Sequence, residues 1–266
     1  MIFYFMKYRK GNRQKLAVMI YLLDNLIGYR TSSAFLRARA LPTLQKCGFQ
    51  GSCLETEVSK QIYCRRGRDF MPKLLYQGHG SYRLSGDDGR VIYVDPYAGD
   101  GYDLPADIIL VTHQHDDHNK VEKCRQKQGC RIITNAEAVV DGRHNSFDVD
   151  GISIQAVEAR NIMHNPKDCV GYIITIGTVK IYASGDTSKT EQMKTFAGLG
   201  LDYAIFCGDG IFNMGLKEAA ECAKLIGAKH NIIIHLKPGV LFDRKKAEKW
   251  DAPDKLIVEP GQEIEL

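Results

Sequence analysis

Residues 107–118 read DIILVTHQHDDH, and this segment changes abruptly from apolar to ionisable side chains. Its first part, residues 107–111, is short and almost continuously apolar, which is typical of a strand buried on both faces of a sheet. The polar part follows at once, so we expect it to form a loop at the end of that strand. Placing three histidines and two aspartates beside a core without a metal or another partner costs several kcal/mol. We therefore interpret the segment as a metal site and not as a polar surface loop.

The spacing within this loop is H-x-H-x-D-H, formed by His113, His115, Asp117 and His118. Imidazole and carboxylate groups are ligands that zinc, manganese and iron accept. On a strand, Asp117 and His118 would face opposite sides because neighbouring side chains alternate. A loop can instead direct them toward two nearby points, which is what a site for two metal ions requires.

Three further residues of metal-binding type lie at the ends of expected strands. His164 lies in a loop before a strand, Asp186 lies in Ser-Gly-Asp-Thr after a strand, and His235 ends the apolar run from residue 231. Open sheets usually build their sites at strand ends. We expect these three side chains to complete the cluster.

The remaining pattern predicts short strands first and alternating helices and strands later. Strands are expected over residues 74–76, 82–84, 91–94, 107–111, 131–134, 152–157, 172–176, 179–183, 202–206 and 231–235. Helices are expected over residues 119–128, 135–140, 189–197 and 216–226, and a hairpin turn over 85–89. This order favours an α+β fold, a layered α/β arrangement of sheets covered by helices.

The charge balance divides the chain near Met71. Residues 1–70 carry a net charge of +9 and residues 71–266 a net charge of −5. We therefore expect a basic N-terminal extension, residues 1–70, and a separate domain, residues 71–266. The apolar spacing from Leu16 to Ile27 predicts an amphipathic helix, and the rest of the extension is expected to be helical or poorly ordered. As an alternative, translation starts at Met71 and residues 1–70 are not part of the natural protein.

The basic-then-apolar start of the chain is similar to a signal peptide, but we do not interpret it as one. No small-residue cleavage site follows residues 16–23 closely, and these eight apolar residues fall short of the about 20 that a membrane-spanning helix needs. The eight cysteines are dispersed and form no C-x-x-C pair, which indicates reduced thiols. We expect a cytoplasmic protein with no membrane partner.

Taken together, the H-x-H-x-D-H motif, the later His164, Asp186 and the final His235 resemble the metallo-β-lactamase superfamily. The resemblance covers residues 71–266 and extends to the UlaG-like group, which includes L-ascorbate-6-phosphate lactonase. The segments that carry this closer likeness are GHGSY (78–82), VGY (170–172), IYASGDT (181–187), NMG (213–215) and EAA (218–220). The resemblance implies an αββα sandwich for residues 71–266, to which residues 1–70 add an N-terminal segment. The turn CGDG (207–210) departs from the usual proline-containing version, and Asp116 occupies a variable position.

The resemblance also implies a ligand set for two divalent metal ions, zinc first, with manganese or iron as alternatives. One ion would be held by His113, His115 and His164. The second would be held by Asp117, His118 and His235, and Asp186 would bridge both ions.

The implied activity is hydrolysis by a metal-bridging hydroxide. The substrate would be a small ester, lactone or phosphodiester, anionic or phosphorylated. Asp117 would orient the attacking water and shuttle its proton. His79 and Lys237 are candidates for contacting an anionic group of the substrate. Their alternative interpretations are a structural histidine and a solvated loop lysine.

Two alternative functions are an RNA-processing nuclease and a non-catalytic metal-binding module. Only 48 residues separate Asp186 from His235, which leaves no room for a large inserted domain, and residues 71–266 are net acidic. An acidic domain disfavours a phosphate-backbone partner. We therefore expect a small-molecule substrate and no nucleic-acid partner, and the sequence leaves a homo-oligomer open.

Overall fold

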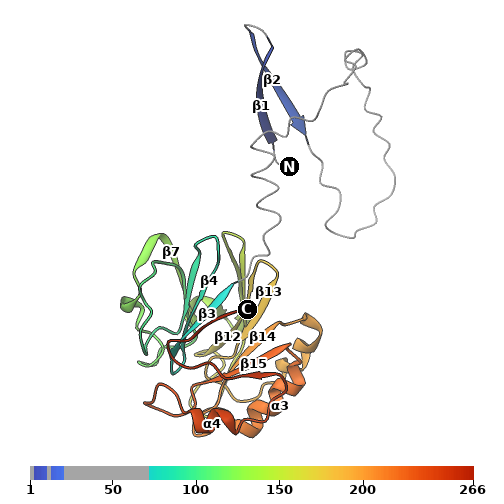
Figure 1. Cartoon of the computed structure of the whole chain (residues 1–266). Helices are drawn as coiled ribbons and strands as arrows, with labels where there is room; N and C mark the ends of the chain where they lie inside the picture. Colours follow the sequence, from blue (N-terminus) through green and yellow to red (C-terminus); the bar gives the residue numbers. More distant parts are fainter. Residues whose placement is uncertain (1–2, 11–12, 21–71) are drawn as a thin grey trace, which may run out of the picture. The chain divides into compact units, whose positions relative to one another are not determined.

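The computed structural model describes residues 3–10, 13–20 and 72–266, and the chain divides into two compact units, Met1–Thr56 and Glu57–Leu266. In the first unit, β1 (Phe3–Lys10) pairs antiparallel with β2 (Arg13–Ile20) (Figure 1).

The helix predicted over residues 16–27 is therefore wrong for residues 16–20, which lie in β2. A short apolar run fits either a helix or a strand, and here the aromatic-rich β1 supplies a pairing partner. Residues 21–27 of this prediction, and the helical or poorly ordered state expected for the rest of the extension, lie outside the described residues.

Two larger sheets make up residues 72–266. The first contains, in spatial order, β17 (Glu263–Glu265), β3 (Lys73–Gly78), β4 (Ser81–Ser85), β5 (Val91–Val94), β6 (Ala106–Val111) and β7 (Gln126–Thr134). The second contains β10 (Ser146–Val149), β11 (Ile152–Glu158), β12 (Val170–Ile176), β13 (Val179–Ala183), β14 (Tyr203–Cys207), β15 (His230–Ile234) and β16 (Lys255–Leu256). Both sheets are mixed: β5, β6 and β7 run parallel, as do β13 through β16, and the other neighbours are antiparallel.

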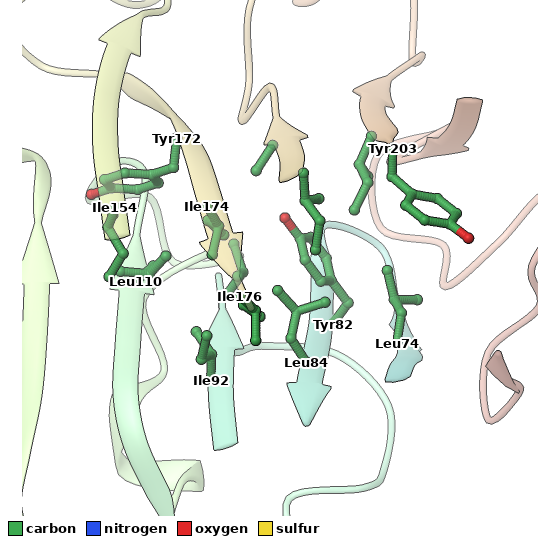
Figure 2. Close-up of a cluster of buried hydrophobic side chains, with 14 of the residues drawn as sticks. Leu74, Tyr82, Leu84, Ile92, Leu110, Ile154, Tyr172, Ile174, Ile176 and Tyr203 are labelled. Atoms are coloured by element: carbon green, nitrogen blue, oxygen red, sulfur yellow. The ribbon is translucent and has the colours of Figure 1, made fainter. Parts of the chain in front are cut away.

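The main core lies between the two sheets. On β5, Ile92 and Val94 belong to this core, whereas Val91 and Tyr93 belong to a second cluster on the other face. This alternation follows from the two-residue period of a strand. Figure 2 shows Ile92 and Leu110 of the first sheet with Ile154, Tyr172 and Ile174 of the second. Burial on both faces explains why the strand before the histidine motif is apolar almost throughout.

Helices cover the outer face of the second sheet (Figure 1). They are the 3-10 helix η3 (Gln192–Leu199), α3 (Leu216–Ile226) and α4 (Arg244–Glu248). The outer face of the first sheet carries a smaller cluster that includes Cys124, next to the 3-10 helix η2 (Val121–Lys123). Two packed mixed sheets with few helices confirm the predicted α+β class.

Several element predictions need correction. The helix expected over residues 119–128 is wrong: only η2 forms there, and β7 begins at Gln126 because it pairs in parallel with β6. The helix expected over 135–140 is shorter, since α2 (Asn135–Ala138) is followed by β8 (Val139–Val140), which pairs with β9 (Arg143–His144). The helix expected over 189–197 is the 3-10 helix η3. By contrast, the bounds predicted for α3 are confirmed.

Among the described helices, none has the length and apolar character needed to cross a membrane.

Candidate metal centre

The predicted metal-binding residues follow the ends of strands from both sheets. His113 lies two residues after β6, Asp186 three residues after β13, and His235 directly after β15. Parallel strands end at one edge of their sheet, so their following loops meet there. The fold thereby gathers residues that are more than a hundred positions apart in the sequence.

Three overlapping groups of side chains converge, each with ligand atoms within 4.8 Å of one another. They are His113, His115 and His164; His113, His118 and Asp186; and His79, Asp117, His118 and His235. All seven residues predicted as metal ligands are thus brought together, and His79 joins them. Lys237 is exposed, and its side chain forms no hydrogen bond or ion pair with the residues that the structure describes.

The first group combines two buried histidines with one exposed histidine. The rings of His113 and His164 lie 4.4 Å apart between centroids, and His164 Nε2 lies 3.2 Å from His115 Nδ1. His113 and His164 are buried, whereas His115 reaches solvent. This group is therefore open on the side of His115.

Asp186 belongs to the second group and lies beside the third. The two carboxylate oxygens of Asp186 lie 3.7 Å from His118 Nε2 and 3.5 Å from His235 Nε2. Asp117 lies 3.9 Å and 4.0 Å from the same two nitrogens. Since Asp186 also converges with His113, it lies between the first and third groups, where a bridging ligand would lie.

Hydrogen bonds outside the cluster orient its histidine rings. Thr112 Oγ1 donates to Asp95 Oδ2 (2.7 Å), so this hydroxyl accepts from His113 Nδ1 (3.0 Å). His118 Nδ1 lies 2.9 Å from the same Asp95 oxygen. In both rings the Nδ1 atom is occupied and Nε2 faces the cluster, which is the arrangement expected of a metal-binding histidine.

Buried nitrogens without partners test whether the residues fit a metal ion. Among the described residues, five buried ring nitrogens of the cluster have no hydrogen-bond partner: His113 Nε2, His118 Nε2, His164 Nδ1, and both ring nitrogens of His235. Each such group costs about 1–3 kcal/mol when it stays unsatisfied. Nitrogen and carboxylate donors in this number match the ligands of a zinc-type cation. The residues fit a bound metal.

The pKa shifts within the cluster determine which ligand atoms are free to bind a cation. Burial lowers the pKa of His113 to about 2, so this ring is neutral and its lone pair is free. Burial alone would raise the pKa of Asp186, but His118 and His235 outweigh it and hold that pKa below its usual range. Burial likewise lowers the pKa of His118, yet Asp186 and Asp95 outweigh it and raise the value to about 9. A cation at His118 Nε2 must therefore displace a proton.

His79 belongs to the third group and is fully buried. Its Nδ1 donates to the carbonyl of Val240 (3.2 Å), and its Nε2 lies 3.1 Å from Asp117 Oδ2. The backbone of His235 donates to the carbonyl of His79 (2.9 Å), which links β3 of the first sheet to β15 of the second. The turn between β3 and β4 thus places His79 next to Asp117.

Sequence reasoning missed two buried carboxylates at this site. Asp95 directly follows β5 and holds both Thr112 and His118. Asp209 Oδ2 lies 3.7 Å from His235 Nδ1. The sequence pattern identifies Asp209 only as part of the turn CGDG (207–210). The signal that identifies Asp186, an aspartate just after an apolar strand, applies equally to Asp95.

Backbone strain gathers at the same place. His79, Asp95 and His235 adopt positive φ angles of 54°, 46° and 48°, and they are three of the six described non-glycine residues that do so. Such conformations persist when the surroundings enforce them, and they cluster at functional sites. Gly80 is required for a different reason, because a Cβ there would lie 2.7 Å from His118 Cε1.

The sequence of residues 73–235 matches the family model described as the β-lactamase superfamily domain. The chain belongs to the metallo-β-lactamase superfamily. This confirms the resemblance found in the motifs at the level of the superfamily, and the UlaG-like assignment stays a prediction.

Relatives in this superfamily cover most of the domain. A protein of Thermococcus onnurineus named UPF0173 metal-dependent hydrolase is 27% identical over 226 residues, which span 74% of this chain and all of that relative. A solved structure of a metal-dependent hydrolase from Parabacteroides distasonis is 26% identical, with a TM-score of 0.57 over 71% of this chain and 94% of that one. A metallo hydrolase of Ignicoccus hospitalis has a TM-score of 0.59 at 19% identity, over 74% of this chain and 98% of its own, and shows the shared fold.

Proposed function

We propose that the protein is a metal-dependent hydrolase with two divalent cations, zinc first. His113, His115 and His164 would hold one cation, and Asp117, His118 and His235 the other, with Asp186 between them. The convergence of these side chains, together with their buried ring nitrogens that have no hydrogen-bond partner, supports this assignment. The names of relatives, which are metal-dependent hydrolases, support it independently.

Divalent cations held by these residues would supply Lewis-acid chemistry: they would activate water for attack and polarise the oxygen of the bond to be cleaved. The protein's own residues divide the remaining work. Asp95 and Thr112 fix the rings of His118 and His113. Asp117 is 38% exposed in its side chain and faces His79 on one oxygen, so it can accept a proton on the solvent side and pass it on.

The proposed substrate is a small ester, lactone or phosphodiester. It would enter from the side of His115, which is the exposed member of the cluster. Lys237 is also exposed and lies two residues after His235, so it can contact an anionic part of the substrate. The net charge of −5 on residues 71–266 favours a small molecule over a nucleic acid.

Turnover by the zinc-loaded full chain tests this function. The assay measures hydrolysis of p-nitrophenyl acetate, a δ-lactone and bis-p-nitrophenyl phosphate. We expect Asp117→Ala to lower kcat/KM at least about hundredfold, because it removes a proposed ligand of the second cation that also handles a proton. Asp116→Ala is the matched control, since that neighbouring side chain is 97% exposed and pairs with Lys120 instead. Full activity of Asp117→Ala would contradict the proposed role. Absence of turnover on every substrate would favour a non-catalytic metal-binding module.

A further inference from the structure

Three loops that carry residues of the metal centre also expose large apolar side chains. Nine large hydrophobic residues are exposed in the described part of the chain, and six of them lie in these loops. We call these six the apolar rim: Ile162, Met163, Ile211, Phe212, Val240 and Leu241. Ile162 and Met163 directly precede His164, and Ile211 and Phe212 follow Asp209.

Hydrogen bonds hold the first two loops in fixed conformations. Asn161 Oδ1 accepts from the backbone nitrogens of Met163 (2.8 Å) and His164 (2.7 Å). Asp209 Oδ1 accepts from the backbone nitrogens of Ile211 (2.6 Å) and Phe212 (2.8 Å). A hydrogen bond from Asn161 Nδ2 to Asn213 Oδ1 joins the two loops. These apolar side chains are therefore carried on pinned backbone.

The third loop, which carries Val240 and Leu241, is hydrogen-bonded to His79 of the metal centre. His79 donates from Nδ1 to the carbonyl of Val240 and from its backbone nitrogen to the carbonyl of Leu241 (2.6 Å). The Tyr76 hydroxyl donates to the same Leu241 carbonyl (3.1 Å). His79, a member of the third ligand group, and Tyr76 thus position this side of the apolar rim.

We infer that the apolar rim binds an alkyl or aryl substituent of the substrate, next to the bond that is hydrolysed. Exposed apolar side chains that gather in one place mark binding surfaces, whereas isolated ones are ordinary. Each of these loops adjoins the ligand cluster: Met163 precedes His164, Asp209 lies 3.7 Å from His235 Nδ1, and the third loop is hydrogen-bonded to His79. A substrate held at the ligand cluster would therefore lie beside the apolar rim, and we assign it as the occupant. This inference rests on the proposed function and narrows the substrate to one that joins a hydrolysable polar group to an apolar one.

The test measures binding and does not depend on turnover. The zinc-loaded full chain is titrated by calorimetry with acetohydroxamate and octanohydroxamate, which share one metal-binding head group and differ in chain length. Octanohydroxamate should bind at least about tenfold more tightly, because burying even two methylenes accounts for that factor. Phe212→Ser and Ile162→Ser should each lose most of this gain. Val140→Ser should keep it, since Val140 is equally exposed but lies in β8, outside the three loops.

The other outcomes separate the two proposals. Equal affinities for the two probes would overturn the apolar rim as a substrate site and leave the proposed function standing. Failure of acetohydroxamate to bind would overturn both. If light scattering shows a dimer that Phe212→Ser converts to a monomer, a second copy covers the apolar rim and the inference is wrong. Sedimentation with phosphatidylcholine vesicles that Phe212→Ser abolishes would overturn it in favour of a lipid surface.

Discussion

Asp95 shows how one buried carboxylate organises the site at the scale of a single residue. Its two carboxylate oxygens form hydrogen bonds with Thr112 and His118. Through the hydroxyl of Thr112 it also orients the ring of His113. It is therefore a positioning residue for both proposed cations. Outer partners of metal-binding histidines contribute strongly to metal affinity because they fix the ring and raise its basicity.

We expect Asp95→Asn to weaken zinc binding about ten- to hundredfold, since the neutral amide holds His118 and Thr112 less strongly. Competition with a chromophoric chelator measures the affinity. Asp100→Asn is the control, because Asp100 is an exposed aspartate in the loop that follows β5. Equal zinc affinities for the two variants would show that Asp95 does not position the ligands.

Gly80 illustrates a steric requirement at the same scale. An added Cβ would lie 2.7 Å from His118 Cε1, so Gly80→Ala must push this ring away from its position. We expect a loss of about 1–3 kcal/mol in the free energy of unfolding and weaker zinc binding. Gly198→Ala is the matched control, because nothing lies within 4 Å of a Cβ at that position. Chemical denaturation that finds the two variants equally stable would contradict this account.

At the scale of elements, Asp202 joins three strands of the second sheet. It precedes β14, its Oδ2 accepts from the backbone nitrogen of Lys180 in β13 (2.8 Å), and its Oδ1 accepts from Lys229 Nζ (2.7 Å), just before β15. Burial raises the pKa of Asp202, but the bonds from Lys229 and Lys180 outweigh it and lower that pKa below 3.8. A lowered pKa means that the ionised form stabilises the fold above the unfolded pKa, and that this contribution disappears as the pH falls through the folded pKa.

Asp202→Asn should therefore lower the free energy of unfolding by about 1 kcal/mol or less at pH 7, as expected for an ion pair whose lysine is 71% exposed. The difference from the unmodified protein should shrink below pH 4 and vanish once the pH lies below the lowered pKa. Urea denaturation at a series of pH values measures it. A difference that stays constant between pH 7 and pH 3 would contradict an electrostatic origin.

Elements with a strong local pattern were predictable, and those fixed by distant pairing were not. The bounds of α3 were predictable because Leu216–Ile226 is amphipathic and is bounded by Gly215 and Gly227. For β7, the strand predicted over residues 131–134 is confirmed, but residues 126–128 were predicted as the end of a helix. This start of β7 was not predictable because its partner β6 lies earlier in the chain and no local pattern reveals that pairing. The same reason explains why Asp95 and Asp209 were missed. Their hydrogen-bond and ion-pair partners come from other elements, whereas His113 and His118 are identified by the spacing of the H-x-H-x-D-H motif.

At the scale of the whole molecule, the candidate metal centre depends on the packing of two sheets. His79 and His113 come from the first sheet, and Asp186 and His235 from the second. The core between the sheets fixes the distance between these two sets. A bound cation would connect them, so metal binding and folding stability are expected to be linked.

The metal content of the full chain tests the central claim most directly. Inductively coupled plasma mass spectrometry after zinc supplementation and removal of free metal should find about two ions per chain, as a dinuclear centre requires. Asp186→Ala should retain one ion or none, because this carboxylate lies between the two groups. A content near zero in the unmodified chain, or two ions retained by Asp186→Ala, would contradict the account.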